Sequence, residues 1–143
     1  MNDTENNAFS TNANNMSCVM YHRKQGFSQA SSPDFIYNSQ SKSGLFSKGT
    51  NSNLKVVFYA GFDYSISLCI DPRLGTGIIF KISDTKTGEV LYDNQEDNMT
   101  THMEFSSEST RNTTIQVSVP KGKPTDKENE GCLGVLIEQR PTP

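Results

Sequence analysis

An antiparallel β-sandwich or jelly roll of about eight short strands is the fold class that this 143-residue sequence predicts. Apolar and polar side chains alternate with a period of two from residue 54 onward, and turn residues interrupt the alternation about every eight to twelve residues. After residue 44 no stretch has a convincing helical period. Because the length suits one domain, we expect a single β-sandwich domain at 37–143, preceded by a polar segment at 1–36.

The segment 1–36 is poor in side chains that a core could bury. Residues 1–17 alone carry six asparagines. Such a stretch cannot offset the entropy of ordering itself unless other residues pack on it, so we expect it to be partly disordered. A short helix at 16–30 is compatible with the sequence, although the apolar residues there form no clean stripe.

The predicted strands end at residues that favour turns or interrupt a β-ladder. They lie near 45–46 and at 54–59, 64–70, 77–83, 90–92, 102–105, 113–119 and 132–138. Gly61 and the Thr87-Gly88 pair suit tight turns, whereas Pro72 supplies no ladder donor. The proline-containing tail at 139–143, QRPTP, is not expected to continue the last strand.

The three cysteines are Cys18, Cys69 and Cys132. Large and small side chains alternate in YSISLC (64–69), which places Cys69 on the face of its strand that points away from the core. Cys132 begins another alternating strand and is also expected on the face away from the core. If the two strands are neighbours, these thiols are candidates for a disulfide that closes a loop of about 60 residues, worth roughly 4 kcal/mol. Two unpaired cysteines, or a bond that involves Cys18, are the alternatives. With no CxxC motif and only two histidines, a zinc site is not expected.

Two patterns are weak candidates for ligand binding. DNQEDN (93–98) places Asp93, Glu96 and Asp97 close together, and carboxylate oxygens are the ligands that calcium prefers. The loop lacks the spacing of a calcium-binding loop, so a solvated turn is the alternative. Phe62 and Tyr59 flank a turn and are candidates for an aromatic ligand platform. The sequence predicts no cofactor other than this calcium ion.

No catalytic signature is evident. His102 and Glu104 are expected to point to the same side of a strand, but the chain contains no GxSxG, HExxH or cysteine–histidine motif. A general base also needs a nucleophile and an orienting partner. An exposed surface histidine is therefore the expectation, with a small hydrolase as an alternative.

Charge and hydropathy limit the kinds of partner that the sequence predicts. The formal net charge is −3, from interspersed acidic and basic residues, so no basic stripe is available for nucleic acid. No apolar run reaches the length of a transmembrane helix. The N-terminus lacks the pattern of a secretory signal, so we expect either a cytoplasmic protein or one whose signal was removed.

Several stretches together resemble a family of small exported proteins of Bacteroidetes-type bacteria. They are 37–50, 61–69, 80–94, 97–98, 105–120 and 131–143. The resemblance implies one β-sandwich domain that follows a signal peptide, broadly similar to pre-peptidase C-terminal and GOLD-type sandwiches. It also implies export into an oxidising compartment, where a disulfide forms more readily. It brings no catalytic residues, and this chain departs from it by starting with a polar, asparagine-rich segment.

The sequence thus predicts a non-catalytic β-sandwich that is exported to the periplasm or cell surface and contacts a protein or a glycan there. A calcium- or carbohydrate-binding module that uses the loop at 93–98 is the first alternative. A small hydrolase is the second. A likeness of fold does not identify the ligand.

Overall fold

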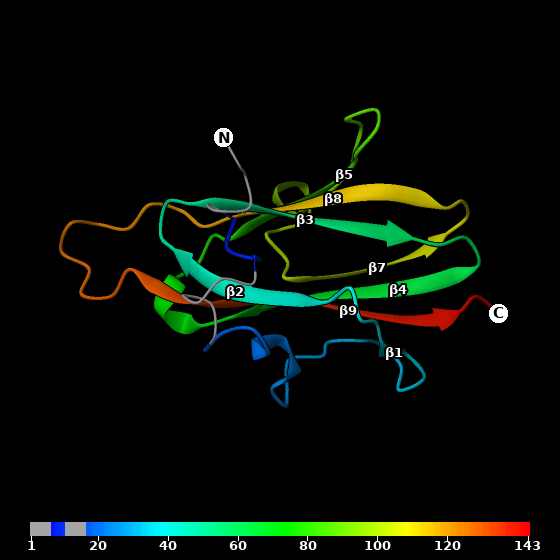
Figure 1. Cartoon of the computed structure of the whole chain (residues 1–143), viewed down its shortest axis with the longest axis horizontal. Helices are drawn as coiled ribbons and strands as arrows, with labels where there is room; N and C mark the ends of the chain where they lie inside the picture. The colour runs from blue at the N-terminus through cyan, green and yellow to red at the C-terminus, as the bar shows by residue number, and fades with distance from the viewer. Residues whose placement is uncertain (1–6, 11–16) are drawn as a thin grey trace.

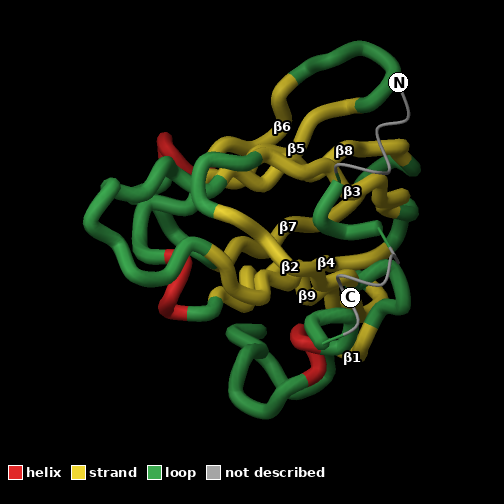
Figure 2. Tube along the Cα trace, turned by 60° about the vertical axis from the view of Figure 1, so that its left-hand side comes forward, coloured by secondary structure: helices red, strands yellow, loops and turns green. Residues whose placement is uncertain are grey.

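Two antiparallel sheets packed face to face form the protein, as Figures 1 and 2 show for a computed structural model that describes residues 7–10 and 17–143. The described residues form nine strands and only short 3-10 helices. This confirms the all-β fold class. No helix in these ranges is long and apolar enough to cross a membrane.

The first sheet has the order β1-β9-β4-β7, and β2 also pairs with β9. Its strands are β1 (Ile36–Tyr37), β2 (Lys42–Ser47), β4 (Phe62–Ile70), β7 (His102–Ser107) and β9 (Glu130–Pro141). The second sheet has the order β3-β8-β5-β6. Its strands are β3 (Asn51–Phe58), β5 (Ile79–Asp84), β6 (Val90–Asp93) and β8 (Arg111–Ser118). The short helices are η2 (Tyr21–Arg23), η3 (Pro72–Leu74) and η4 (Asn94–Glu96).

The core lies between the sheets and takes alternate residues from each strand. Phe58 and Tyr64, which are almost fully buried, meet edge to face with ring centroids 4.7 Å apart. The backbone N–H of Tyr59 donates to the Tyr64 hydroxyl at 2.8 Å, which satisfies the one polar group of that buried ring. Burial of each large side chain contributes roughly 1.5–3 kcal/mol. The period-two pattern of the sequence therefore describes real inward and outward faces.

The eight predicted strands are all present, and two features at the ends of the chain differ from the prediction. The two-residue strand β1 was not predicted. The tail was expected to leave the sheet, but β9 continues to Pro141, which pairs with Phe62. That prediction is wrong because a proline in the last pair of a strand interrupts little of the ladder. Arg140 also anchors the tail, since its guanidinium lies 3.1 Å from Asp63 and 3.0 Å from Asp34.

Residues 17–35, which we call the N-terminal strap, lie on the outer face of the first sheet (blue in Figure 1). The strap covers the small side chains of β4, and Ser65, Ser67 and Cys69 are therefore fully buried. The backbone N–H of Gln29 donates to the Ser67 hydroxyl at 3.2 Å. The disorder predicted for 1–36 falls partly on 1–6 and 11–16, which lie outside the described residues. The strap itself makes specific contacts with the sheet.

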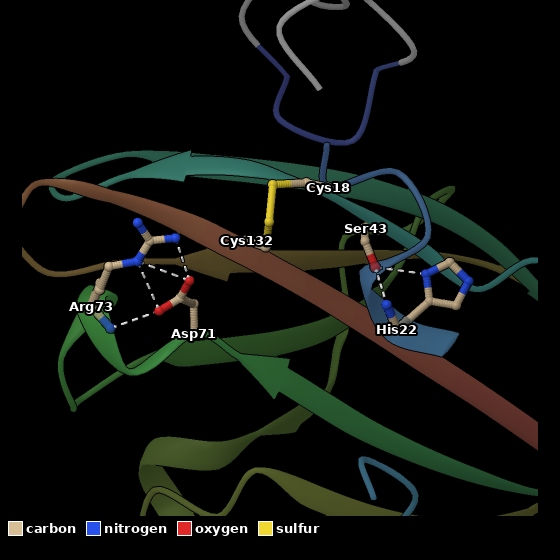
Figure 3. The surroundings of a disulfide bond; sticks show 6 residues. All are labelled: Cys18, His22, Ser43, Asp71, Arg73 and Cys132. Carbon is tan, nitrogen blue, oxygen red and sulfur yellow. Dashed lines mark hydrogen bonds and ion pairs between the residues drawn. A yellow bond between two sulfur atoms is a disulfide. The ribbon is translucent and has the colours of Figure 1, made fainter. Parts of the chain in front are cut away.

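A disulfide joins Cys18 of the strap to Cys132 of β9, with Cα atoms 5.3 Å apart (Figure 3). The predicted Cys69–Cys132 bond is wrong, because Cys69 is a free thiol. The ladder pairs Cys69 with Gly134, so Cys132 lies two residues farther along the neighbouring strand. Diagonal neighbours of this kind are separated by about 7–8 Å, which exceeds the usual Cα spacing of a disulfide. Cys18 reaches Cys132 from above the sheet instead.

We expect Cys69 to be inert in the folded protein. Its side chain is fully buried beneath the strap, and burial raises the pKa of the thiol to about 12. Because the thiolate is the reactive species, a thiol reagent should label no cysteine of the oxidised native chain. The same reagent should label one after unfolding in denaturant. Rapid labelling of the native chain, or labelling of no cysteine in denaturant, would contradict this assignment.

His22 bonds the strap to β1 and β2 and packs closely on β9. Its backbone N–H donates to the Ser43 hydroxyl at 2.8 Å, and its ring nitrogen Nδ1 lies 2.6 Å from the same oxygen (Figure 3). Its other ring nitrogen, Nε2, lies 3.0 Å from Tyr37 Oη. A Cβ at Gly134 would lie 2.9 Å from the His22 Cβ and 2.2 Å from the Ser43 hydroxyl, so glycine is required at this contact. Burial, together with the charge of Arg23, lowers the pKa of His22.

Stability should therefore fall as the pH drops below about 6.5. In that range the unfolded chain binds a proton at His22 more readily than the folded chain, so stability falls with a slope of at most about 1.4 kcal/mol per pH unit. Carboxylates whose pKa values are lowered in the folded protein reduce its stability only below about pH 4.5. Their effect on stability is therefore separate from that of His22. Urea unfolding between pH 7 and pH 5 measures this effect. His22→Gln should flatten the curve, and an equal slope in both proteins would rule out His22 as its source.

Candidate binding site between β6 and β7

A groove of about 310 Å³ opens between β6 and β7, which are edge strands of the two sheets. Its floor is formed by the buried core residues Phe58 and Ile82. Figure 2 shows β6 in one layer and β7 in the other, and residues of both strands line the same groove. The groove therefore gives access to the core from the side of the molecule.

The walls of the groove are mainly apolar. β6 contributes Leu91 and Tyr92, and β7 contributes Met103 and Phe105. The Phe105 ring packs edge to face on Phe58, with centroids 5.0 Å apart. Leu91 is 40% exposed, as expected for an apolar side chain at an open edge. The size and lining resemble those of sites that take one side chain or a small apolar group.

Charged groups surround this apolar surface. Arg111 lines the groove and lies 3.6 Å from Asp84 and 3.4 Å from Glu89. The Tyr92 hydroxyl donates to Asp97 at 2.7 Å, and burial together with this carboxylate raises the pKa of the tyrosine. Glu108 also lines the groove and is exposed. Among the charged groups named here, Glu108 and Arg111 line the groove itself, and Arg111 is already paired with two carboxylates.

The serines of the groove are not arranged for nucleophilic catalysis. The Ser106 hydroxyl donates to Asp63 at 2.6 Å, and the Ser107 hydroxyl donates to the carbonyl of Ser109 at 3.0 Å. No histidine lines the groove. A serine nucleophile needs an adjacent base, and these serines instead bond to Asp63 and to a backbone carbonyl.

His102, which was expected to be exposed, is partly buried on the outer face of the first sheet. Ser65 Oγ and Glu104 Oε2 approach the same ring nitrogen, Nε2, at 3.0 and 3.2 Å. A catalytic triad instead uses the two ring nitrogens for different partners. Ser65 is also fully buried, and Ser31 of the strap donates two hydrogen bonds to Glu104. The cluster joins the strap to the sheet, and the hydrolase alternative gains no support from it.

The acidic loop that was a candidate for calcium forms the η4 turn. Asp93 accepts a hydrogen bond from the backbone N–H of Gln95, Asp97 binds Tyr92, and Glu96 is exposed. The structure does not bring the three carboxylates together. Among residues 7–10 and 17–143, no three histidine, cysteine or acidic side chains form a group that could hold a metal ion.

The two aromatic residues of the candidate platform behave differently. Tyr59 is 51% exposed, whereas Phe62 packs against the core. The Phe62 ring lies 6.3 Å from that of Tyr64. Only one ring is therefore presented to solvent at this turn.

No family model and no curated protein sequence matches the chain. Solved structures of PliG, a periplasmic lysozyme inhibitor of g-type lysozyme, have a similar fold. The Aeromonas hydrophila protein is 12% identical with a TM-score of 0.48, over 73% of this chain and 88% of that one. The Salmonella Typhimurium protein is 11% identical with a TM-score of 0.44, over 73% and 95%. Similarity at this level does not identify a function.

Proposed function

We propose that the chain is a non-catalytic β-sandwich of the cell envelope that binds a protein. The observation that carries this proposal is the apolar groove between β6 and β7, which leaves Leu91, Met103 and Phe105 accessible beside core residues. A protein side chain matches such a surface better than a glycan does. A glycan platform presents flat rings that are open to solvent, whereas Tyr92 and Phe105 of the groove are only partly exposed.

The Cys18–Cys132 bond supports export. Disulfides persist in oxidising compartments and are rare where thiols are kept reduced. The resemblance to small exported proteins of Bacteroidetes-type bacteria points the same way, and membership of that family remains part of the proposal. The periplasm or the cell surface is the location that fits both. Alkylation of free thiols in intact source cells should find Cys18 and Cys132 bonded, whereas a reduced pair would contradict export.

Binding specificity can be tested with two probes of the oxidised full-length chain. One is a phage-displayed library of short random peptides, and the other is a glycan array. We expect peptides to be enriched and glycans to give no signal. Enrichment of no peptide, or binding to glycans alone, would overturn the proposal that the partner is a protein.

A further inference from the structure

The sandwich has two lateral openings, and the chain fills one of them itself. Phe9 lies between β2 and β3, is 4% exposed and packs edge to face on Phe46, with ring centroids 5.2 Å apart. Its neighbour Ala8 donates its backbone N–H to Ser52 of β3 at 3.0 Å. A Cβ on Gly44 would overlap the Ala8 carbonyl at 1.6 Å, so β2 carries glycine where this segment passes. A turn at residues 7–10 with one buried phenyl ring thus closes this side.

The edge of β3 at the same opening is also satisfied by side chains. The Gln40 amide accepts from Val57 N–H at 2.8 Å and donates to the Val57 carbonyl at 2.9 Å. The Asn7 amide donates to the Asn53 carbonyl at 2.6 Å. Unpaired strand edges tend to recruit other chains, and side chains placed over them prevent this.

The opposite opening, between β6 and β7, has no such filling among the described residues. It contains the apolar groove, and β7 pairs only with β4. Thr100 covers the start of this edge, because its hydroxyl bonds both the N–H and the carbonyl of His102. From Glu104 to Ser106 no other strand of the described residues lies beside β7. An extended peptide can add to a strand edge of this kind.

The charge around the groove selects among peptides. Glu108 is exposed at the groove and has no ion pair among the described residues, and Arg111 is already shared by Asp84 and Glu89. Glu108 is therefore the charged lining group left to pair with a ligand, and it favours a segment that carries a basic residue. Complementary charge raises association rates and rejects acidic competitors.

We infer that the groove binds an extended, basic segment of a partner protein that lies along β7 and inserts one aromatic or large aliphatic side chain, as Phe9 does on the opposite side. This inference rests on the proposed function and names the chemistry of the partner. The inserted side chain contacts Leu91, Met103 and Phe105. Lysine or arginine residues beside it lie near Glu108.

The peptides enriched from the library test the inference. We expect an aromatic or large aliphatic residue flanked by lysine or arginine, and slower hydrogen exchange of the Glu104 and Ser106 amides on binding. Leu91→Asp and Glu108→Lys should each weaken binding by about tenfold or more. Glu128→Lys makes the same change in net charge on a distant loop and should leave the affinity unchanged. Both groove residues are exposed, so the variants should fold.

The results separate the inference from the proposed function. Peptides that bind equally well to Leu91→Asp, Glu108→Lys and the unmodified chain would overturn the inference and leave protein binding in place. Acidic peptides, or an equal loss of affinity in Glu128→Lys, would also overturn it. If no peptide is enriched, both fail.

Discussion

Replacing Cys18 and Cys132 by serine is expected to lower the free energy of unfolding by about 5 kcal/mol. The bond joins residues 114 positions apart, so it removes a large number of conformations from the unfolded chain. It also fixes the N-terminal strap to β9. Urea denaturation of the double variant and of the oxidised wild type measures the difference. Dithiothreitol should bring the wild type to the stability of the variant and leave the variant unchanged.

The free cysteine supplies the matched control. Cys69→Ala removes a buried thiol without breaking a bond, so it should cost about 1 kcal/mol and keep the response to reductant. Trypsin should cut after Arg23 and Lys24 faster in the double variant, because these exposed residues flank the end of η2 in the strap. A peptide map that joins Cys69 to Cys132, or stability that is unaffected by reductant, would refute the assigned pairing.

Asn94→Ala is expected to lower the free energy of unfolding by about 3–5 kcal/mol. Asn94 is fully buried, and its side-chain oxygen accepts from Phe80 N–H at 2.9 Å. Its side-chain nitrogen donates to the carbonyls of Ile78 and Thr100 at 3.0 and 3.1 Å. Alanine leaves these three groups without a partner, and each such group costs about 1–3 kcal/mol when it is buried.

Two further variants at this loop sharpen the test. Asn94→Asp can still accept from Phe80 but faces two carbonyl oxygens with no proton to donate, so it should be about as destabilising near neutral pH. Glu96→Ala, on the exposed side of η4, should change stability by less than about 0.5 kcal/mol. Equal stabilities of Asn94→Ala and Glu96→Ala would show that the buried amide has no such role.

The strands were predictable because each has one face in the core. In β3 the alternation follows directly from burial of every second residue. In β4 the large side chains face the core, and the small ones between them are buried beneath the strap. β1 has only two residues, too few for any period to appear. The extension of β9 to Pro141 depends on pairing with β4, which the local sequence does not encode.

The cysteine pairing was not predictable from strand patterns alone. The sequence feature that could have indicated a covering segment is the row of small side chains on the outer face of β4. Ser65, Ser67 and Cys69 are small enough for another segment to pack closely on them. Gly134 on the neighbouring strand provides the same close approach. Sequence alternation indicates which face lacks large side chains, but not whether another segment lies on it.

The groove was missed for a topological reason. Met103 and Phe105 alternate as core residues do, and they are accessible only because β7 is the edge of its sheet. The sequence feature that could have indicated the groove is the adjacent apolar pair Val90 and Leu91 in a strand of only four residues. In the structure these side chains are 56% and 40% exposed. The acids at 93–98 are close in sequence, but the turn of η4 directs them to different partners.

The Gln40 amide on Val57 bears on how copies of the protein behave at high concentration. It reproduces at this residue both hydrogen bonds that a neighbouring strand would make. A second copy that adds along this part of β3 would first have to displace the amide, so the side chain protects the strand from pairing between molecules.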